Sequence, residues 1–387
     1  MTMIHITQTI WRRPMVLRLL LAVSLLAVLG GAAGVNAAPP GHVLVLNSYH
    51  QGLSWTDSIV QGIESVLGGD SDLELHIEYM DTKHLYDEVY LQKLYELYQY
   101  KYSQMQFEVV MVTDNNAFEF LRQHYDELFP GTPVVFCGIN DFRDSMLEGY
   151  DLFTGVVEVT DIESTLEIAL QLHPNVAQVA VVNDRTSTGV ALESELQALI
   201  PRFEDSMEFV LIEDLDMAEV QAQVKTLPAD SLILLLVFNR DASGQFFSYE
   251  ESLAQISSVT TLPIYGLWDF YLGGGIVGGK LASGFHQGEA AAKITQRILG
   301  GEAVEDIPVV KESPNRYMFD YVQLQRFGLE PSALPADSIV INSPDTFYDR
   351  YRTLIWGSLG IVAALILIVS ILLASINRRK RAEKHIQ

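Results

Sequence analysis

One apolar stretch near the C-terminus constrains the organisation of this 387-residue chain more than any other feature. Residues 354–376 read LIWGSLGIVAALILIVSILLASI and contain no charged side chain. A helix needs about 20 apolar residues to cross a hydrocarbon core of about 30 Å, so we predict a transmembrane helix here. The cations RRKR at 378–381 come directly after it, and such clusters mark the cytoplasmic side of a span. A buried core helix is the alternative, which the length of the run and its basic exit disfavour.

The N-terminus is typical of an export signal. Three arginines, at positions 12, 13 and 18, precede an apolar run that ends near Val35, and VNA at 35–37 places small residues before a cleavage site after Ala37. We therefore predict that residues 1–37 are a signal peptide, with an uncleaved signal anchor as the alternative. Both versions export the chain beyond Ala37, although an uncleaved anchor would be a second membrane helix. We expect a single-pass protein of a bacterial inner membrane, with its main domain in the periplasm and a basic cytoplasmic stub over 377–387.

Charge and cysteine content limit the partners and the chemistry. The formal net charge is −24, and the exported part is more acidic still because both terminal segments are basic. Such a surface repels nucleic acid, so we expect no nucleic-acid partner. The one cysteine, Cys137, lies in the apolar stretch PVVFCG and is predicted to be a small buried side chain.

Short β-branched runs alternate with amphipathic stretches throughout the exported part. HVLVLNS at 42–48 is apolar almost throughout, as buried parallel strands are, and a helical pattern covers 54–67. The same alternation continues to Trp268, which predicts βαβ units and parallel sheets. We expect a first α/β lobe over 41–154 and a second over 155–272, as two open sheets around a cleft. Asp161 is an expected N-cap at the start of the second lobe.

The segment 273–345 breaks this rhythm and is interpreted as a return, hinge and linker segment. Its glycine-rich sequence GGGIVGGKLASG lacks the Gly-Lys-Ser/Thr ending of a phosphate-binding loop. The glycines are therefore expected to permit close backbone approach near a hinge. No Pro or Gly interrupts Thr346 to Trp356, so a juxtamembrane helix over 346–353 is expected to run unbroken into the span.

Several motifs together resemble one family. They are LNSYH at 46–50 with Gly52 and Trp55, EYMDTK at 78–83, GG at 278–279, GEAA at 288–291, SPN at 313–315, FDY at 319–321, and INSP at 341–344 with Phe347 and Tyr348. The chain resembles, over about residues 42–356, the ABC-transporter substrate-binding-protein-like sensor domain of bacterial membrane sensor kinases and diguanylate cyclases. The resemblance implies a two-lobed periplasmic-binding-protein-like fold with three crossovers, and a small-molecule ligand, with an amino acid or aromatic solute as first expectation. Those receptors carry a cytoplasmic output domain, whereas this sequence stops at Gln387.

Candidate binding residues are given by the rule that ligands lie beyond the carboxyl ends of the strands in open α/β sheets. Polar and aromatic residues stand at these positions, as in a pocket with aromatic walls and a few polar groups. The predicted ligand-binding residues are Ser48, Tyr49, Trp55, Asp114, Asn115, Asn140, Glu158, Asp184, Thr186, Asn239 and Trp268.

Each candidate has a structural alternative. Asp or Asn at a strand end is often only the N-cap of the next helix, and Tyr49 and Trp55 could be core aromatics. Arg185 and Arg240 could meet a ligand carboxylate or form local salt bridges. The nine histidines are scattered without a His-x-x-x-His pair, so we predict no metal site, no cofactor and no catalytic residues.

Two functions from different classes remain. The first is a membrane-anchored sensor, in which ligand-driven closure of the lobes passes through the helix into the membrane to a cytoplasmic signalling partner. The second is a tethered substrate-binding protein that delivers solute to an ABC permease. A homodimer is compatible with either organisation.

Overall fold

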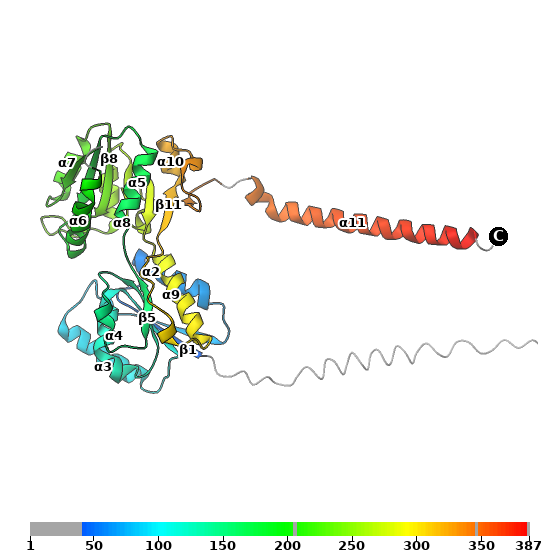
Figure 1. The fold of residues 1–387 in the computed structure, drawn as a ribbon, viewed down its shortest axis with the longest axis horizontal. Coiled ribbons are helices and arrows are strands. Elements are labelled where there is room, and N and C mark those ends of the chain that lie inside the picture. The colour runs from blue at the N-terminus through cyan, green and yellow to red at the C-terminus, as the bar shows by residue number, and fades with distance from the viewer. Residues whose placement is uncertain (1–40, 204–206, 345–346, 385–387) are drawn as a thin grey trace, which may run out of the picture.

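The computed structural model describes residues 41–203, 207–344 and 347–384. The predicted signal peptide lies outside the described residues. The described chain forms two α/β lobes, one above the other in Figure 1, and a long C-terminal helix that extends away from them. This confirms the predicted two-lobed α/β class.

The first lobe is built on a five-stranded parallel sheet in the order β2-β1-β3-β4-β5. Its strands are β1 (Gly41–Asn47), β2 (Leu73–Tyr79), β3 (Val109–Thr113), β4 (Val134–Ile139) and β5 (Phe153–Val157). Its helices are α2 (Ser54–Leu67), α3 (Glu88–Tyr102), α4 (Asp114–Leu128) and α9 (Gly284–Leu299). β3, β4 and β5 are buried along their whole length because helices cover both faces of the sheet. Cys137 is buried in β4, as predicted.

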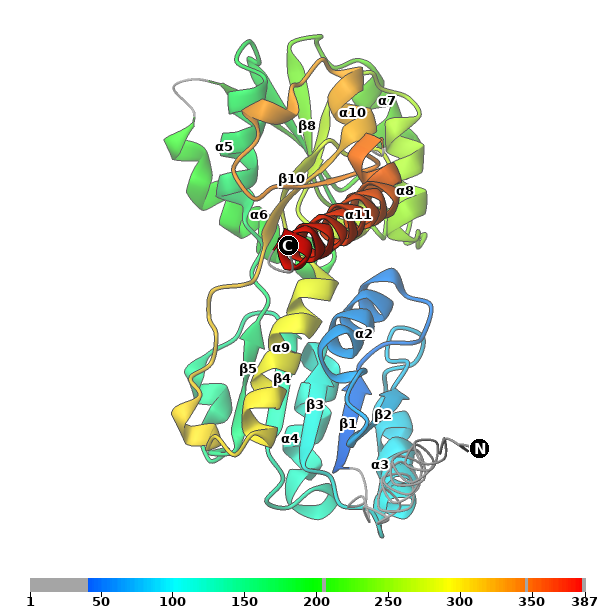
Figure 2. The same ribbon diagram turned by 90° about the vertical axis from the view of Figure 1, so that its right-hand side faces the viewer.

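Two helix pairs cover the two faces of this sheet. α2 and α9 pack on one face, where Val43 and Val45 of β1 point, and α3 and α4 pack on the other, which receives Leu44 and Leu46. Figure 2 shows α2 and α9 side by side in front of the sheet. Successive side chains of β1 thus point to opposite faces of the sheet, and each face has its own layer of core residues.

The second lobe contains a seven-stranded sheet in the order β12-β11-β10-β9-β8-β6-β7. It is parallel except where β10 and β11 pair antiparallel. Its strands are β6 (Gln178–Asn183), β7 (Glu208–Ile212), β8 (Ser231–Val237), β9 (Ile264–Gly266), β10 (Gly278–Leu281), β11 (Arg316–Asp320) and β12 (Ile339–Ile341). Its helices are α5 (Ile162–Leu172), α6 (Ser187–Leu199), α7 (Met217–Lys225), α8 (Tyr249–Ser257) and α10 (Tyr321–Arg326). Asp161 caps α5 by accepting a hydrogen bond from the Ser164 amide.

The structure places the lobe boundaries differently from the sequence-based ones. We predicted that the second lobe begins at residue 155, whereas β5 pairs with β4 and completes the first sheet. The segment 273–345 is not only a return and linker, because it supplies β10, β11 and β12 to the second sheet and α9 to the first lobe. Which sheet a strand joins depends on its pairing with segments distant in sequence. Hydrophobic periodicity carries no information about that pairing.

The chain crosses between the lobes three times. It leaves the first lobe after β5, returns after β10 to form α9, and leaves again after Val310, whose backbone bridges to Val156. Of the glycines expected near a hinge, Gly278 and Gly279 lie within β10 of the second sheet. A Cβ on Gly278 would be 2.2 Å from the carbonyl oxygen of Met318, and Gly278 has a φ of +151°. They do serve close backbone approach, but between strands β10 and β11.

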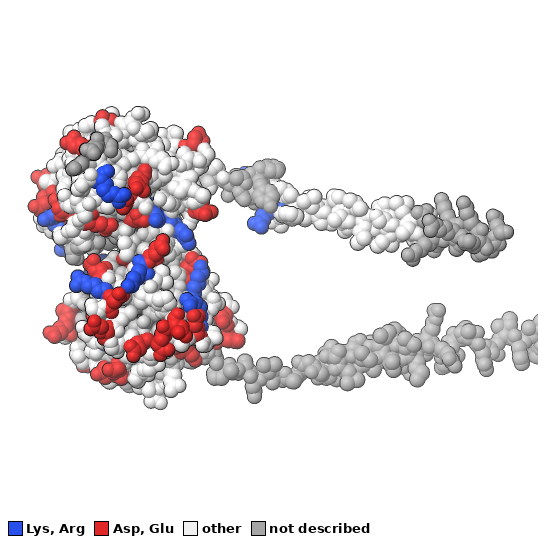
Figure 3. Space-filling model, viewed as in Figure 1, with Lys and Arg blue, Asp and Glu red and all other residues white. Residues whose placement is uncertain are grey.

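The C-terminal helix α11 (Phe347–Lys384) is continuous. Its segment Arg350–Ile376 has a mean hydropathy of 3.0 over its most apolar window, which is not buried against the lobes. It is therefore a candidate membrane span by length and composition. Figure 3 shows that acidic side chains are spread over the visible face of both lobes, while the stretch of α11 drawn in white is uncharged.

Candidate ligand-binding cleft

A cleft lies between the two lobes. Its larger part is a cavity of about 730 Å³, and a narrower part of about 80 Å³ shares five lining residues with it. These shared residues are Tyr49, Asn140, Glu158, Thr188 and Trp268. Both lobes contribute to this set, so a solute here would contact both lobes at once.

A tryptophan–aspartate pair from the first lobe lines the narrow part. Asp114 comes after β3 as the first residue of α4, and Trp55 lies in the first turn of α2. The indole Nε1 of Trp55 donates a hydrogen bond to Asp114 Oδ1 over 2.8 Å. Asp114 has only 3% of its surface exposed, and its φ of +64° is unusual for a residue other than Gly. Strained backbone of this kind clusters at functional sites.

A second tryptophan–carboxylate pair joins the two lobes. Glu158 comes after β5, at the first crossing between the lobes. Trp268, which comes after β9 in the second lobe, donates from Nε1 to Glu158 Oε1 over 2.8 Å. Asn140, which comes after β4 in the first lobe, donates from Nδ2 to Glu158 Oε2 over 3.2 Å. One buried carboxylate is thus held by side chains from both lobes.

Aromatic rings form one wall of the narrow part. Phe270 stacks on Tyr249 with ring centroids 4.3 Å apart and on Trp268 with centroids 5.8 Å apart. Trp55, from the first lobe, meets the Phe270 ring edge-on at 6.4 Å. Such a wall presents flat apolar surface, which favours aromatic or other planar apolar groups.

The charged groups that line the narrow part are two carboxylates and one ammonium. Burial raises the pKa of Asp114 to about 7, against the opposing effects of the Trp55 hydrogen bond and nearby Lys83. Burial also raises the pKa of Glu158 to about 8, and the proximity of Asp114 adds to this rise. Lys83 lines the narrow part, with Nζ 4.4 Å from the centroid of the Tyr49 ring. When both carboxylates are ionised, their negative charge exceeds the single positive charge of Lys83.

The structure brings one group of the predicted binding residues together at the cleft. This group comprises Tyr49, Trp55, Asp114, Asn115, Asn140, Glu158 and Trp268. Asn115 and Asn140 also fix each other, because the Asn115 amide donates to the Asn140 carbonyl and accepts from its N–H, both over 3.0 Å.

The other predicted residues lie elsewhere and have local partners. Ser48 Oγ accepts from the Ala117 amide at the start of α4 and donates to the Thr113 carbonyl. Asp184 accepts from the backbone amides of Thr186 and Asn239. Thr186 caps α6, and both it and Asp184 line a separate cavity of about 100 Å³. Thr186 is thus an N-cap, whereas Ser48 and Asp184 join the ends of neighbouring strands within one lobe.

Asn239 and Arg185 do not line the cleft themselves. The Asn239 amide donates to the Tyr249 hydroxyl over 3.4 Å. This hydrogen bond helps to orient Tyr249, which is part of the aromatic wall. Arg185 pairs with Glu193 at 2.7 Å and Glu213 at 3.5 Å, which is the salt-bridge alternative.

Among the residues that line the narrow part, the predicted set lacked the charged Lys83 and the aromatic Tyr249 and Phe270. Lys83 lies just beyond the end of β2, so the strand-end rule could have found it had it been applied to that strand. Phe270 is two residues beyond the predicted Trp268. Tyr249 is the first residue of α8, after the loop that follows β8. No sequence pattern indicates that this side chain lines the cleft.

Fold and cleft together define the class of two-lobed solute-binding proteins. A family model described as ABC transporter substrate binding protein matches residues 109–330. The chain belongs to this family. A comparison with curated proteins found no match.

Solved structures show the same fold at low sequence identity. A ligand-free, open substrate-binding protein with adhesive properties from Clostridium difficile superposes with a TM-score of 0.57 at 12% identity, covering 79% of this chain and 100% of that one. An ABC domain in complex with L-Trp from Streptococcus pneumonia gives a TM-score of 0.53 at 16% identity, with coverages of 78% and 100%. A conserved domain protein from Vibrio cholerae gives a TM-score of 0.51 at 16% identity, with coverages of 77% and 99%.

Proposed function

We propose that this protein is a membrane-anchored extracytoplasmic sensor that binds a small solute between its lobes and signals through α11. The observation that carries the proposal is Glu158, a buried carboxylate held by Asn140 of the first lobe and Trp268 of the second. A solute that displaces or joins these bonds would act on both lobes at once. In this proposal the lobes lie on the periplasmic side of a bacterial inner membrane.

The lining favours a solute that combines a cationic amine with a flat apolar group. Asp114 and Glu158 can each form charge-assisted hydrogen bonds with an ammonium group, and the stack of Tyr249, Phe270 and Trp268 can pack against a planar body. The Lys83 ammonium offers a partner for a ligand carboxylate. An aromatic amino acid carries all three features, and an aromatic amine carries two.

Signalling requires that the solute bind the closed arrangement of the lobes better than the open one. A ligand shifts a conformational equilibrium only by its difference in affinity for the two states. Contacts that need both lobes, such as those around Glu158, supply such a difference. The unbroken helix α11 supports transmission of the motion, because no irregular backbone separates its first turn from the candidate span.

A thermal-shift screen of the full-length protein in detergent tests the binding step. We expect aromatic amino acids or aromatic amines to raise the Tm, because a ligand that binds only the native state stabilises it. The double variant Trp55→Phe/Trp268→Phe keeps the aromatic surface but loses both indole donors, so its affinity should fall by at least about 10-fold. Tyr100→Phe, at an exposed position on α3, should bind as the unmodified chain does. Equal affinity in the double variant would place the binding site elsewhere.

Delivery of solute to an ABC permease is the second candidate, and membership of the substrate-binding-protein family favours it. Uptake of a radiolabelled hit from the screen separates the two functions. Cells without the gene should take up the solute normally if the protein is a sensor, and should lose high-affinity uptake if it feeds a permease. A sensor also needs a cytoplasmic signalling partner, which crosslinking from the basic end of α11 would capture.

A further inference from the structure

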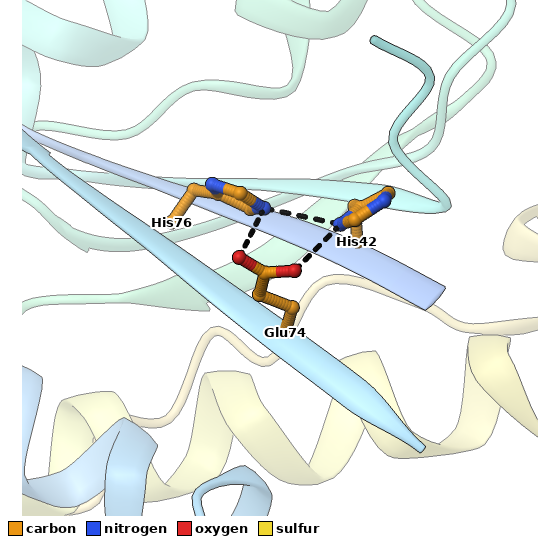
Figure 4. Close-up of side chains that lie close together, drawn as sticks. All are labelled: His42, Glu74 and His76. Atoms are coloured by element: carbon orange, nitrogen blue, oxygen red, sulfur yellow. Dashed lines mark hydrogen bonds and ion pairs between the residues drawn. The ribbon is translucent and has the colours of Figure 1, made fainter. Parts of the chain in front are cut away.

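Two histidines and a glutamate meet at the edge of the first lobe. Figure 4 shows His42, Glu74 and His76 with their polar atoms turned toward one another. His42 Nδ1 lies 3.1 Å from His76 Nε2. The Glu74 carboxylate lies 3.6 Å from His42 Nδ1 through Oε2 and 3.8 Å from His76 Nε2 through Oε1. We call this set the His-Glu-His cluster.

Strand register creates the cluster from residues that are distant in sequence. β1 and β2 pair in parallel, with His42 opposite Glu74 and Leu44 opposite His76. Paired residues share a face, and so do residues two apart in one strand, so all three side chains lie on the α3/α4 face of the sheet. The ring of Phe107 packs edge-on against His76 at 5.5 Å and limits its orientation. No local sequence motif could reveal such a site.

The spacing of the three atoms fits a metal ion. A tetrahedral Zn²⁺ with bonds of about 2.0–2.1 Å separates its ligand atoms by about 3.3–3.4 Å. The 3.1 Å between the two imidazole nitrogens lies within a few tenths of an ångström of this value, and one Glu74 oxygen lies within 4.8 Å of both nitrogens. Imidazole and carboxylate are ligands that Zn²⁺ prefers. Glu108, which accepts a hydrogen bond from the His42 amide, adds a second negative charge nearby. We propose that the His-Glu-His cluster binds Zn²⁺ through three protein ligands, with a fourth position open to water.

A second group of the same composition provides an internal contrast. In the set His50, Asp81 and His84, the Asp81 Oδ1 atom lies 2.6 Å from His84 Nδ1 and 3.3 Å from His50 Nδ1. A 2.6 Å separation is that of a direct charge-assisted hydrogen bond. That distance is well below the separation of about 3.3 Å between ligands of a tetrahedral Zn²⁺, so this set fits the ion less well and serves as the control.

The position of the cluster gives the metal a structural role. It lies at the amino ends of β1 and β2, whereas the cleft lies beyond the carboxyl ends of the strands. A bound ion would link the first residues of β1 to the neighbouring strand and stabilise that edge of the lobe. Because the two sites are at opposite ends of the sheet, zinc and solute should bind independently.

Calorimetric titration with Zn²⁺ tests the site on the full-length protein in detergent, purified without a polyhistidine tag. We expect the unmodified chain to bind Zn²⁺ and gain Tm. His42→Gln, His76→Gln and Glu74→Gln should each weaken binding by at least about 10-fold, since even outer-shell partners contribute about 10–100-fold. His84→Gln should bind as the unmodified chain does. Binding of Co²⁺ should give the visible absorption bands of a four-coordinate ion, which His76→Gln should lose.

Three results would overturn the proposal. The first is the absence of zinc binding at micromolar concentrations by the unmodified chain. The second is unchanged affinity in His42→Gln and His76→Gln whose circular dichroism spectra show a folded protein. The third is loss of binding in His84→Gln alone, which would assign the metal to the other group.

Discussion

At the scale of single residues, the two carboxylates of the cleft dominate the physical chemistry of the protein. Asp114 and Glu158 are almost fully buried, and each accepts a hydrogen bond from a tryptophan. Their raised pKa values mean that the folded, ligand-free protein holds protons that the unfolded chain releases. Stability and ligand binding must therefore both depend on pH.

We expect the stability of the ligand-free protein to fall as the pH rises from about 4 to about 8. Burial raises the pKa of Asp114 from 3.8 to about 7 and that of Glu158 from 4.5 to about 8. In this window the folded state binds more protons than the unfolded state, so the free energy of unfolding decreases, by up to about 1.4 kcal/mol per pH unit for each carboxylate. Thermal melts of the full-length protein between pH 4 and 8 measure the slope.

Asp114→Asn and Glu158→Gln should each flatten this pH dependence, because the amides do not titrate. Asp230→Asn, at an exposed position, should leave the slope unchanged. An equal slope in the Asp114→Asn, Glu158→Gln and unmodified proteins would mean that neither carboxylate is protonated in the folded state.

The affinity for a cationic solute should change with pH in the opposite sense. An ammonium group favours the ionised carboxylates, so its binding should strengthen as the pH rises from about 6 toward 8, with release of protons on binding. Calorimetry in two buffers of different ionisation enthalpy counts those protons. Binding that weakens over the same pH range would favour an anionic or neutral solute.

At the scale of elements, the contact between α2 and α9 joins segments more than 200 residues apart. Three glycines bring the two helices together. A Cβ on Gly62 would lie 2.1 Å from the Phe285 carbonyl oxygen, and one on Gly288 would lie 2.1 Å from that of Ile59. A Cβ on Gly284 would lie 2.8 Å from the Trp55 carbonyl oxygen. The position of Trp55 in the cleft thus depends on this close packing.

Gly288→Ala should lower the free energy of unfolding by about 1–3 kcal/mol, because the added methyl group meets backbone that cannot rotate away. Gly69→Ala is the matched control, since a Cβ there meets nothing within 4 Å. Chemical denaturation followed by tryptophan fluorescence measures both. A Gly288→Ala protein as stable as the Gly69→Ala protein would show that the two helices can separate at little cost.

At the scale of the whole molecule, the arrangement of lobes, helix and membrane decides the function. The helix α11 contains the candidate span, whose most apolar window is not buried, and it extends away from the second lobe (Figure 1). The lobes carry most of the acidic side chains, and the sequence beyond the span is basic. Basic residues beyond a span are typical of its cytoplasmic flank, which is the orientation that the proposed function requires.

Cysteine labelling in intact cells tests this topology. Ser71→Cys, at an exposed position before β2, should react with a membrane-impermeant maleimide in spheroplasts. The native Cys137 is fully buried and should give little background. Glu383→Cys, beyond the span, should react only after the membrane is permeabilised. The reverse pattern would place the lobes in the cytoplasm and exclude an extracytoplasmic sensor.

Local sequence patterns determined the elements and much of the cleft. Apolar runs and helical periodicity predicted the alternating strands and helices as far as β9, because a side chain's place in the core depends on the period of the backbone. The strand-end rule found Tyr49, Asp114 and Glu158, because parallel strands place their carboxyl ends at one edge of a sheet. The length and hydropathy of residues 354–376 were enough to predict a span, which the candidate helix of the structure matches.

Tertiary structure alone decided which of these groups meet. Asp184 and Asp114 both come directly after a strand, yet one is bound by backbone amides of its own lobe and the other reaches the cleft. The membership of β5 in the first sheet, the return of α9, and the meeting of His42 with His76 depend on pairing across long stretches of sequence. Such pairing is selected by the packing of the whole chain, and a local pattern reports only which face of an element is buried.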